Sequence, residues 1–146
     1  MEEKPLRHLI LHGEYELNID DKNRFLIPAE IRKKMDPERD GAAFFLVIGE
    51  DRRPWMYTER FYESLVSEVP AALTPGRDRL AYDRRVFGTA SYLEPDKQGR
   101  VLLPESMRKR TALDKEVTLV GVRDHLEIWN RPDWEAERER LFEGTG

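Results

Sequence analysis

The chain has 146 residues, of which 37% are charged and 39% are hydrophobic, and its formal net charge at pH 7 is -4. It has no cysteine, which excludes disulfide scaffolds, thiolate zinc sites and cysteine nucleophiles. No apolar run is long enough to span a bilayer, and the start Met1-Glu2-Glu3 lacks the features of a secretory signal, so a cytoplasmic location is expected. Because the balance is acidic, any binding of nucleic acid would depend on a local basic surface.

Alternating polar and apolar residues mark the first predicted element. Between Glu14 and Asp20 the apolar side chains would share one face, which predicts a half-buried strand. A short helix is expected from Pro28, because proline is tolerated at the first helical position. The elements predicted as far as Pro70 are a strand over 14–20, a turn over 21–23, a strand over 25–27, the helix 28–35, a loop over 36–41, strands over 42–48 and 55–57, and a helix from its N-cap Thr58 to Pro70.

The stretch 70–79 is the predicted linker, because it contains prolines and a glycine between two helical patterns. The elements predicted after it are a helix over 80–87, a strand over 91–93, a turn over 97–99, a strand over 101–103, a helix from Pro104, a hairpin of strands 116–122 and 126–129, and a final helix capped by Asn130. This mixture predicts an α+β fold with short peripheral helices.

The chain contains an internal repeat, because residues 20–34 recur 76 positions later as residues 96–110. Six of the fifteen aligned positions are identical, which indicates a duplicated supersecondary unit. Units of this size expose strand edges and half a core, so the two copies are expected to complete each other about a pseudo-twofold axis. The predicted organisation is an N-terminal extension over 1–11, a first repeat over 12–76 and a second repeat over 77–146.

Each copy contains the pattern Asp-x-x-x-Arg, as Asp20/Arg24 and Asp96/Arg100. The residue before each arginine is asparagine or glycine, which predicts a left-handed backbone conformation and a chain reversal. One interpretation is structural, because the aspartate can accept hydrogen bonds from turn amides and hold the arginine. The other is functional, because the turn would present its arginine to phosphates and guanine edges, helped by Lys22 in the first copy and Lys97 in the second.

A basic cluster ends the short helix of each copy: Arg32, Lys33 and Lys34 in the first, and Arg108, Lys109 and Arg110 in the second. Cations at this position complement the helix dipole. They could equally contact DNA phosphates, and we keep both interpretations.

An enzymatic function is not expected. The acidic residues Glu14, Glu16 and Asp20 could bind Mg²⁺ from one face of the first strand, but the second copy does not repeat the cluster, so solvated surface is the favoured interpretation. The 3 histidines lack metal-ligand spacing, and no catalytic motif, phosphate loop or cofactor fingerprint is present. We therefore expect no metal and no small-molecule cofactor.

The chain resembles the MraZ family of bacterial transcriptional regulators over residues 12–142. The segments that carry the resemblance are Gly13-Glu14-Tyr15-Glu16, Asp20-Asp21-Lys22-Asn23-Arg24, Ile27-Pro28, residues 96–104, residues 113–117, Leu119-Val120-Gly121 and Leu126-Glu127-Ile128-Trp129. The resemblance implies two tandem AbrB/SpoVT-like swapped-hairpin β units, a ring-shaped homo-oligomer, and recognition of G-rich direct repeats upstream of the division and cell-wall gene cluster. Its DNA-contacting motif falls on Asp20, Arg24, Asp96 and Arg100. Asn23 stands where the family usually has glycine, which a left-handed turn tolerates.

The expected function is therefore sequence-specific binding of double-stranded DNA by a nucleoid-associated repressor. Several weak basic turns on one assembly would bind DNA avidly. The alternative is an AbrB-like protein-interaction or antitoxin module, in which the acidic C-terminal helix binds a partner protein and DNA contact is secondary.

Overall fold

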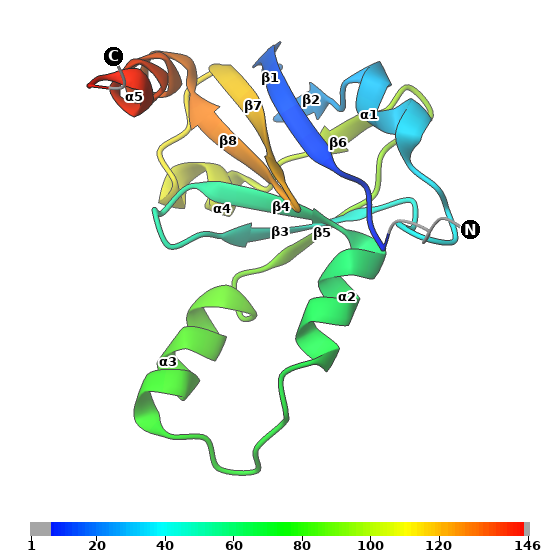
Figure 1. Ribbon diagram of the computed structural model, residues 1–146, viewed down its shortest axis with the longest axis vertical. Coiled ribbons are helices and arrows are strands. Elements are labelled where there is room, and N and C mark those ends of the chain that lie inside the picture. The colour runs from blue at the N-terminus through cyan, green and yellow to red at the C-terminus, as the bar shows by residue number, and fades with distance from the viewer. Residues whose placement is uncertain (1–6, 145–146) are drawn as a thin grey trace.

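The computed structural model describes residues 7–144 (Figure 1). Its elements, in chain order, are β1 (Leu11–Asn18), β2 (Arg24–Leu26), α1 (Ala29–Lys34), β3 (Phe44–Ile48), β4 (Pro54–Thr58), α2 (Glu59–Ser67), α3 (Arg77–Val86), β5 (Ser91–Leu93), β6 (Arg100–Leu102), α4 (Glu105–Arg110), β7 (Glu116–Arg123), β8 (Leu126–Asn130) and α5 (Arg131–Phe142). The α+β class predicted from the sequence is confirmed. Residues 1–6, which belong to the predicted N-terminal extension, lie outside the described part.

The main sheet joins strands from both halves of the chain. Its order is β1-β7-β8-β4-β3-β5, and its pairs are antiparallel. Strand β1 pairs with β7 along its whole length, from Leu11 opposite Arg123 to Asn18 opposite Glu116. Strand β5 in turn pairs with β3, so each half supplies an edge strand to the other half. Neither half could form this sheet alone, which is consistent with the expectation that each copy is too small to be stable by itself.

Strands β2 and β6 form a separate two-stranded antiparallel ribbon. Phe25 lies opposite Val101 in the register, and both side chains are buried. Arg24 lies opposite Leu102, and Leu26 lies opposite Arg100. Because side chains alternate along a strand, these last four residues share the other face of the ribbon. The ribbon therefore has one face on the core and one face toward solvent.

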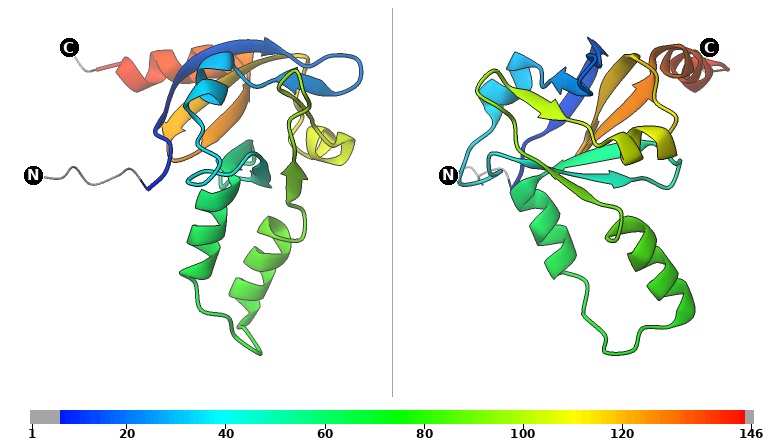
Figure 2. Two further views of the ribbon diagram at one scale, coloured as in Figure 1. Left: turned by 90° about the vertical axis from the view of Figure 1, so that its right-hand side faces the viewer. Right: turned by 180° about the vertical axis from the view of Figure 1, so that it is seen from behind.

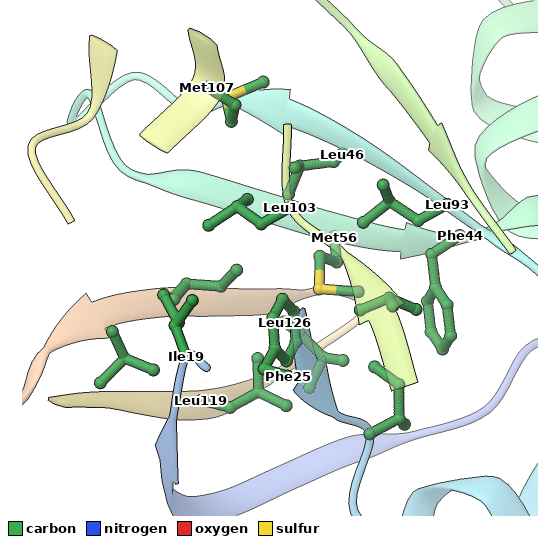
Figure 3. Close-up of a cluster of buried hydrophobic side chains, with 14 of the residues drawn as sticks. Ile19, Phe25, Phe44, Leu46, Met56, Leu93, Leu103, Met107, Leu119 and Leu126 are labelled. Atoms are coloured by element: carbon green, nitrogen blue, oxygen red, sulfur yellow. The ribbon is translucent and has the colours of Figure 1, made fainter. Parts of the chain in front are cut away.

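The hydrophobic core lies between the ribbon and the main sheet, and Figure 3 shows its side chains converging from both. Phe25 from β2 and Leu103, just after β6, meet Leu119 and Leu126 of the main sheet in this cluster. Ile31 of α1 and Met107 of α4 are buried at its edge, so one apolar residue anchors each short helix. The core thus fixes the ribbon and the two turns that precede its strands.

Helices α2 and α3 extend side by side away from the sheet, and Figure 2 shows them from two further sides. The helical spacing of Leu65 and Val69 is typical of a core face, but these residues are 36% and 58% exposed. They line an apolar groove of about 470 Å³ between the two helices and strands β3 and β4. Helix α3 begins at Arg77, inside the stretch predicted as linker.

The two predicted N-cap residues occupy the predicted positions but do not cap through their side chains. Thr58 and Asn130 precede α2 and α5, but neither side chain makes a capping hydrogen bond. The amide of Asn130 instead donates to the carbonyl of Ala112 at 2.9 Å and accepts from the N–H of Asp114 at 2.7 Å. Asn130 therefore ties α5 to the loop after α4. Within residues 7–144, no helix is long and apolar enough to cross a membrane.

Candidate nucleic-acid interface

The first Asp-x-x-x-Arg segment, residues 20–24, forms a tight turn that is called turn 1 below. The carboxylate of Asp20 accepts from the backbone N–H groups of Lys22 and Arg24, both at 2.9 Å through Oδ1. Its other oxygen accepts from Nε of Arg24 at 3.0 Å. Asn23 has a φ of 61°, so the predicted left-handed conformation is confirmed. One aspartate thus folds the turn and orients its arginine.

The second segment, residues 96–100, repeats this geometry as turn 2. Asp96 Oδ1 accepts from the N–H groups of Gln98 and Arg100 at 2.9 Å, and Oδ2 accepts from Nε of Arg100 at 2.9 Å. Gly99 has a φ of 88°. Arg100 also donates through Nη2 to the side-chain oxygen of Gln98 at 3.3 Å. The two turns are therefore chemically equivalent where they hold their arginines.

Hydrogen bonding keeps both aspartates ionised. The bond from the backbone N–H of Arg24, with further bonds from Lys22 and the guanidinium, lowers the pKa of Asp20 below its ordinary value. The corresponding bonds from Arg100 and Gln98 lower the pKa of Asp96. Both arginine side chains remain partly exposed, at 29% for Arg24 and 35% for Arg100. Each guanidinium is consequently oriented on one edge and open to solvent on another, which suits a charged ligand.

The two turns lie at opposite ends of the ribbon and share its outer face. That face carries Arg24 and Arg100 together with two exposed leucines, Leu26 at 43% and Leu102 at 59%. The two leucines occupy aligned positions in the two copies of the repeat. The presence of leucine at both aligned positions is the sequence feature that could have identified them as part of the site. The outer face is thus a mixed basic and apolar surface.

The remaining basic candidates lie in the two turns and at the ends of the two short helices. Lys22 and Lys97 lie in the two turns and are exposed. Among the helix-end cations, Lys33 and Arg110 are exposed, while Lys34 and Lys109 pair with acids one turn earlier at 3.7 and 3.4 Å. Asp21 of turn 1 also accepts from Nζ of Lys115 at 3.1 Å.

Arg32 and Arg108 differ from these cations because each reaches the turn of the opposite copy. Arg108 donates from Nη1 to the side-chain oxygen of Asn23 at 2.6 Å, across 85 residues. Arg32 covers Gly99, where an added Cβ would lie 2.6 Å from its Nε. Sequence reasoning did not find these contacts, because residue spacing carries no information about pairing over such separations. The sequence indicates a difference between the two turns only through the different residues, Asn23 and Gly99, at aligned positions.

The acidic candidates on β1 do not form a metal site. Glu14 accepts from Nε1 of Trp134 at 2.5 Å and from Nη1 of Arg138 at 2.6 Å, and these bonds from Trp134 and then Arg138 lower its pKa. Glu14 therefore anchors α5 to β1. Across residues 7–144, no group of three or more histidine or acidic side chains is arranged to hold a metal ion.

Comparison with known proteins supplies the family. The sequence model of a family described as "MraZ protein, putative antitoxin-like" matches residues 86–143. A protein named transcriptional regulator MraZ from Desulforamulus reducens is 34% identical over 90% of this chain and 91% of its own. Its counterparts in Moorella thermoacetica and Ligilactobacillus salivarius are 37% and 34% identical, covering 84% and 90% of this chain and 82% and 90% of their own. Because similarity at this level extends along almost the whole chain, the protein belongs to the MraZ family of transcriptional regulators.

Proposed function

We propose that this protein is a sequence-specific DNA-binding transcriptional regulator that contacts DNA with turn 1, turn 2 and the outer face of the ribbon. The observation that carries the proposal is the pair of aspartate-held arginines, Arg24 and Arg100, on one exposed face. Each of the two guanidinium groups is held by an aspartate and is partly exposed to solvent, so neither contributes to the packing of the core. Together they provide two cations at a fixed separation.

A two-stranded β-ribbon is an element that can bind DNA. The major groove of B-form DNA admits a two-stranded β-ribbon, and arginine donates two hydrogen bonds to the O6 and N7 atoms of guanine. Arg24 and Arg100 would therefore recognise G·C pairs, in keeping with the expected G-rich direct repeats. Leu102 lies opposite Arg24 and Leu26 lies opposite Arg100, and both leucines would contact apolar groups of the bases, such as thymine methyl groups. Asp20 and Asp96 would act by orienting the arginines.

Phosphate contacts would come from the cations around this face. Lys22 and Lys97 extend from the turns, and Lys33, Lys34, Lys109 and Arg110 end the two short helices. Such contacts position a protein on the duplex without specifying sequence, and they make binding salt-dependent. Arg32 and Arg108 belong to the same clusters, but their side chains contact the turns of the opposite copies.

The architecture proposed for this function is a pair of AbrB/SpoVT-like swapped-hairpin units related by a pseudo-twofold axis. The strand order β1-β7-β8-β4-β3-β5 supports it, because exchanging each strand for its aligned counterpart in the other half gives the same order reversed. The proposed repeats are 12–76 and 77–146, with 1–11 as an extension. The loop between α2 and α3 contains the boundary.

A ring of identical subunits is the proposed assembly, with a second copy of this chain covering the apolar groove. Val66, Val69 and Tyr82 line that groove and are 39%, 58% and 46% exposed, which is unusual for neighbouring apolar residues on a monomer. A groove on one subunit that receives a different surface of the next is a head-to-tail contact, and such contacts form a ring when the rotation between subunits closes. A ring would present many ribbons to DNA and raise the effective concentration of each.

The regulated target would be the division and cell-wall gene cluster, and occupation of its promoter by a nucleoid-associated assembly would repress transcription. The competing proposal, a module whose acidic C-terminal helix binds a partner protein, has less support. Helix α5 is attached to its own sheet through Trp134 and Arg138, and Trp134 packs against Trp129 with ring centroids 5.3 Å apart.

The experiment that tests the proposal is titration of the protein against DNA from upstream of its own gene, with a shuffled sequence as control. Preferential binding to the G-rich repeats, weakening as salt rises with a log–log slope of about -0.9 for each phosphate contacted, is the expected result. Equal affinity for both sequences would overturn the proposal. Measuring the mass of the protein alone would determine whether a ring forms.

A further inference from the structure

We infer that Arg32 and Arg108 are positioning residues that fix each turn to the opposite half of the chain and so set the separation of the two DNA-contacting arginines. The inference rests on the function proposed above. Its starting observation is that each arginine leaves its own copy and contacts the left-handed residue of the other copy's turn.

Arg108 ties turn 1 to α4. Its Nη1 donates to Oδ1 of Asn23 at 2.6 Å, and its Nε donates to the carbonyl of Leu113 at 3.1 Å. The backbone repeats the connection, because the N–H of Leu103 donates to the carbonyl of Asn23 at 2.7 Å. The planar guanidinium can make these two side-chain bonds in different directions at once, which a lysine ammonium on the same stem cannot reproduce.

Arg32 holds turn 2 by packing. Its Nε donates to the carbonyl of Ile27 at 2.9 Å, and its side chain covers Gly99, which is buried. A Cβ on Gly99 would lie 2.6 Å from Nε and 2.7 Å from Cδ of Arg32, so any other residue at this position would require the Arg32 side chain to move. The backbone again repeats it, since the N–H of Ile27 donates to the carbonyl of Gly99 at 2.9 Å.

These contacts explain why the aligned positions differ. Asn23 supplies the acceptor that Arg108 uses, while Gly99 supplies the space that Arg32 occupies. Each aspartate fixes its arginine within one turn. One turn is fixed relative to the other by the pairing of β2 with β6 and, at the turns themselves, by the contacts of Arg108 and Arg32. Binding of two bases by Arg24 and Arg100 depends on that separation, and preorganising it reduces the entropy lost on binding.

The test replaces Arg108 and Arg32 by lysine, which keeps the charge and removes the directed bonds. Arg60→Lys is the matched control, because it makes the same change at an exposed arginine of α2 that lies outside the proposed DNA contact. Arg108→Lys and Arg32→Lys should each weaken binding to the G-rich repeats by about tenfold, while binding to shuffled DNA and the salt slope stay unchanged. A merely phosphate-contacting arginine would tolerate lysine and would affect both DNAs alike.

A measurement without DNA separates this inference from the proposed function. In Arg108→Lys the amide of Leu103 should exchange with solvent about tenfold faster, while that of Ile27 is unchanged, and Arg32→Lys should give the reverse. Unchanged exchange at both amides would overturn the inference. Faster exchange with undiminished preference for the G-rich repeats would also overturn it, by separating the contacts from recognition. Absence of any sequence preference in the unsubstituted protein would overturn the proposed function instead, while the exchange result still reports on the contacts.

Discussion

At the scale of single residues, the left-handed positions of the two turns show how a small chemical difference is used. Asparagine tolerates this conformation because its short polar side chain bonds locally, and glycine tolerates it because it has no Cβ. Asn23 and Gly99 share the backbone conformation, with φ values of 61° and 88°. Their surroundings are not interchangeable. The side chain of Asn23 accepts a hydrogen bond from Arg108, whereas Gly99 has no side chain and so leaves space for Arg32.

Gly99→Asn is therefore expected to destabilise the protein although asparagine suits the backbone. The new Cβ would displace Arg32 and break its bond to the carbonyl of Ile27, at a cost of about 1–2 kcal/mol in unfolding free energy. The check is denaturant unfolding of Gly99→Asn alone and in an Arg32→Ala background. The cost of the glycine substitution should fall in the second background. An equal cost in both backgrounds would mean that Arg32 does not occupy this space.

Much of the site could be predicted at this scale. The turn positions, the left-handed conformation and the aspartate–arginine pairing all follow from local chemistry, and the structure contains them. The contacts of Arg32 and Arg108 could not be predicted, because they join residues brought together only by the complete fold. The outward direction of Leu26 was within reach, since alternation from the buried Phe25 requires it.

At the scale of elements, the β7–β8 hairpin carries a charged cluster that sequence reasoning passed over. The ring of His125 is almost buried, stacks on Trp55 with centroids 4.1 Å apart, and has a carboxylate oxygen 2.8 Å from each nitrogen. Burial acts to lower its pKa, but the hydrogen bonds with Glu127 and Asp124 outweigh burial and raise the pKa above its ordinary value of 6.5. Both nitrogens are thus suited to carry protons.

Stability should therefore depend on pH through this hairpin. A histidine whose pKa is raised on folding stabilises the folded state fully below its unfolded pKa of about 6.5, and the contribution is lost as pH rises through the folded value. We expect the difference in unfolding free energy between the protein and His125→Gln to be larger at pH 6 than at pH 9. Denaturant unfolding at both values measures it. A difference that grows with pH would contradict the assignment of a doubly protonated ring.

The elements themselves were largely predictable where local patterns decide them. Alternation located β1, and proline located the starts of α1 and α4. The apolar residues of α2 are exposed although their helical spacing predicts a buried face. Such spacing does not specify whether the face is covered by the same chain or by another molecule. The start of α3 at Arg77 was not predicted, because the prolines and the glycine of the preceding stretch are typical of a linker, while the helix begins immediately after Gly76.

At the scale of the whole molecule, the arrangement separates two surfaces. In Figure 1 the ribbon and the α2–α3 pair lie at opposite ends of the view. The proposed DNA contact and the proposed subunit contact would therefore not compete for the same side chains. A substitution in one surface should leave the other intact.

Val69→Asp tests that separation. It places a charge in the apolar groove at a residue that is 58% exposed, so the fold should survive while self-association fails. Light scattering during size-exclusion chromatography should show a smaller species than the unsubstituted protein. Ser64→Asp, at an exposed position of α2 outside the groove, is the control and should leave the mass unchanged. An unchanged mass for Val69→Asp would remove the groove as the contact.

The most direct test of the central claim is the affinity of Arg24→Ala and Arg100→Ala for the G-rich repeats, measured beside Arg60→Ala. Arg60 is an exposed arginine on α2 with its own acidic partner, Glu63, at 3.2 Å, so it controls for loss of a paired surface cation. Each turn substitution should weaken specific binding by about 5- to 150-fold, as expected for one lost arginine–guanine pair, while mass and unfolding remain those of the unsubstituted protein. Unchanged affinity of both turn variants, or equal losses in Arg60→Ala, would contradict the account.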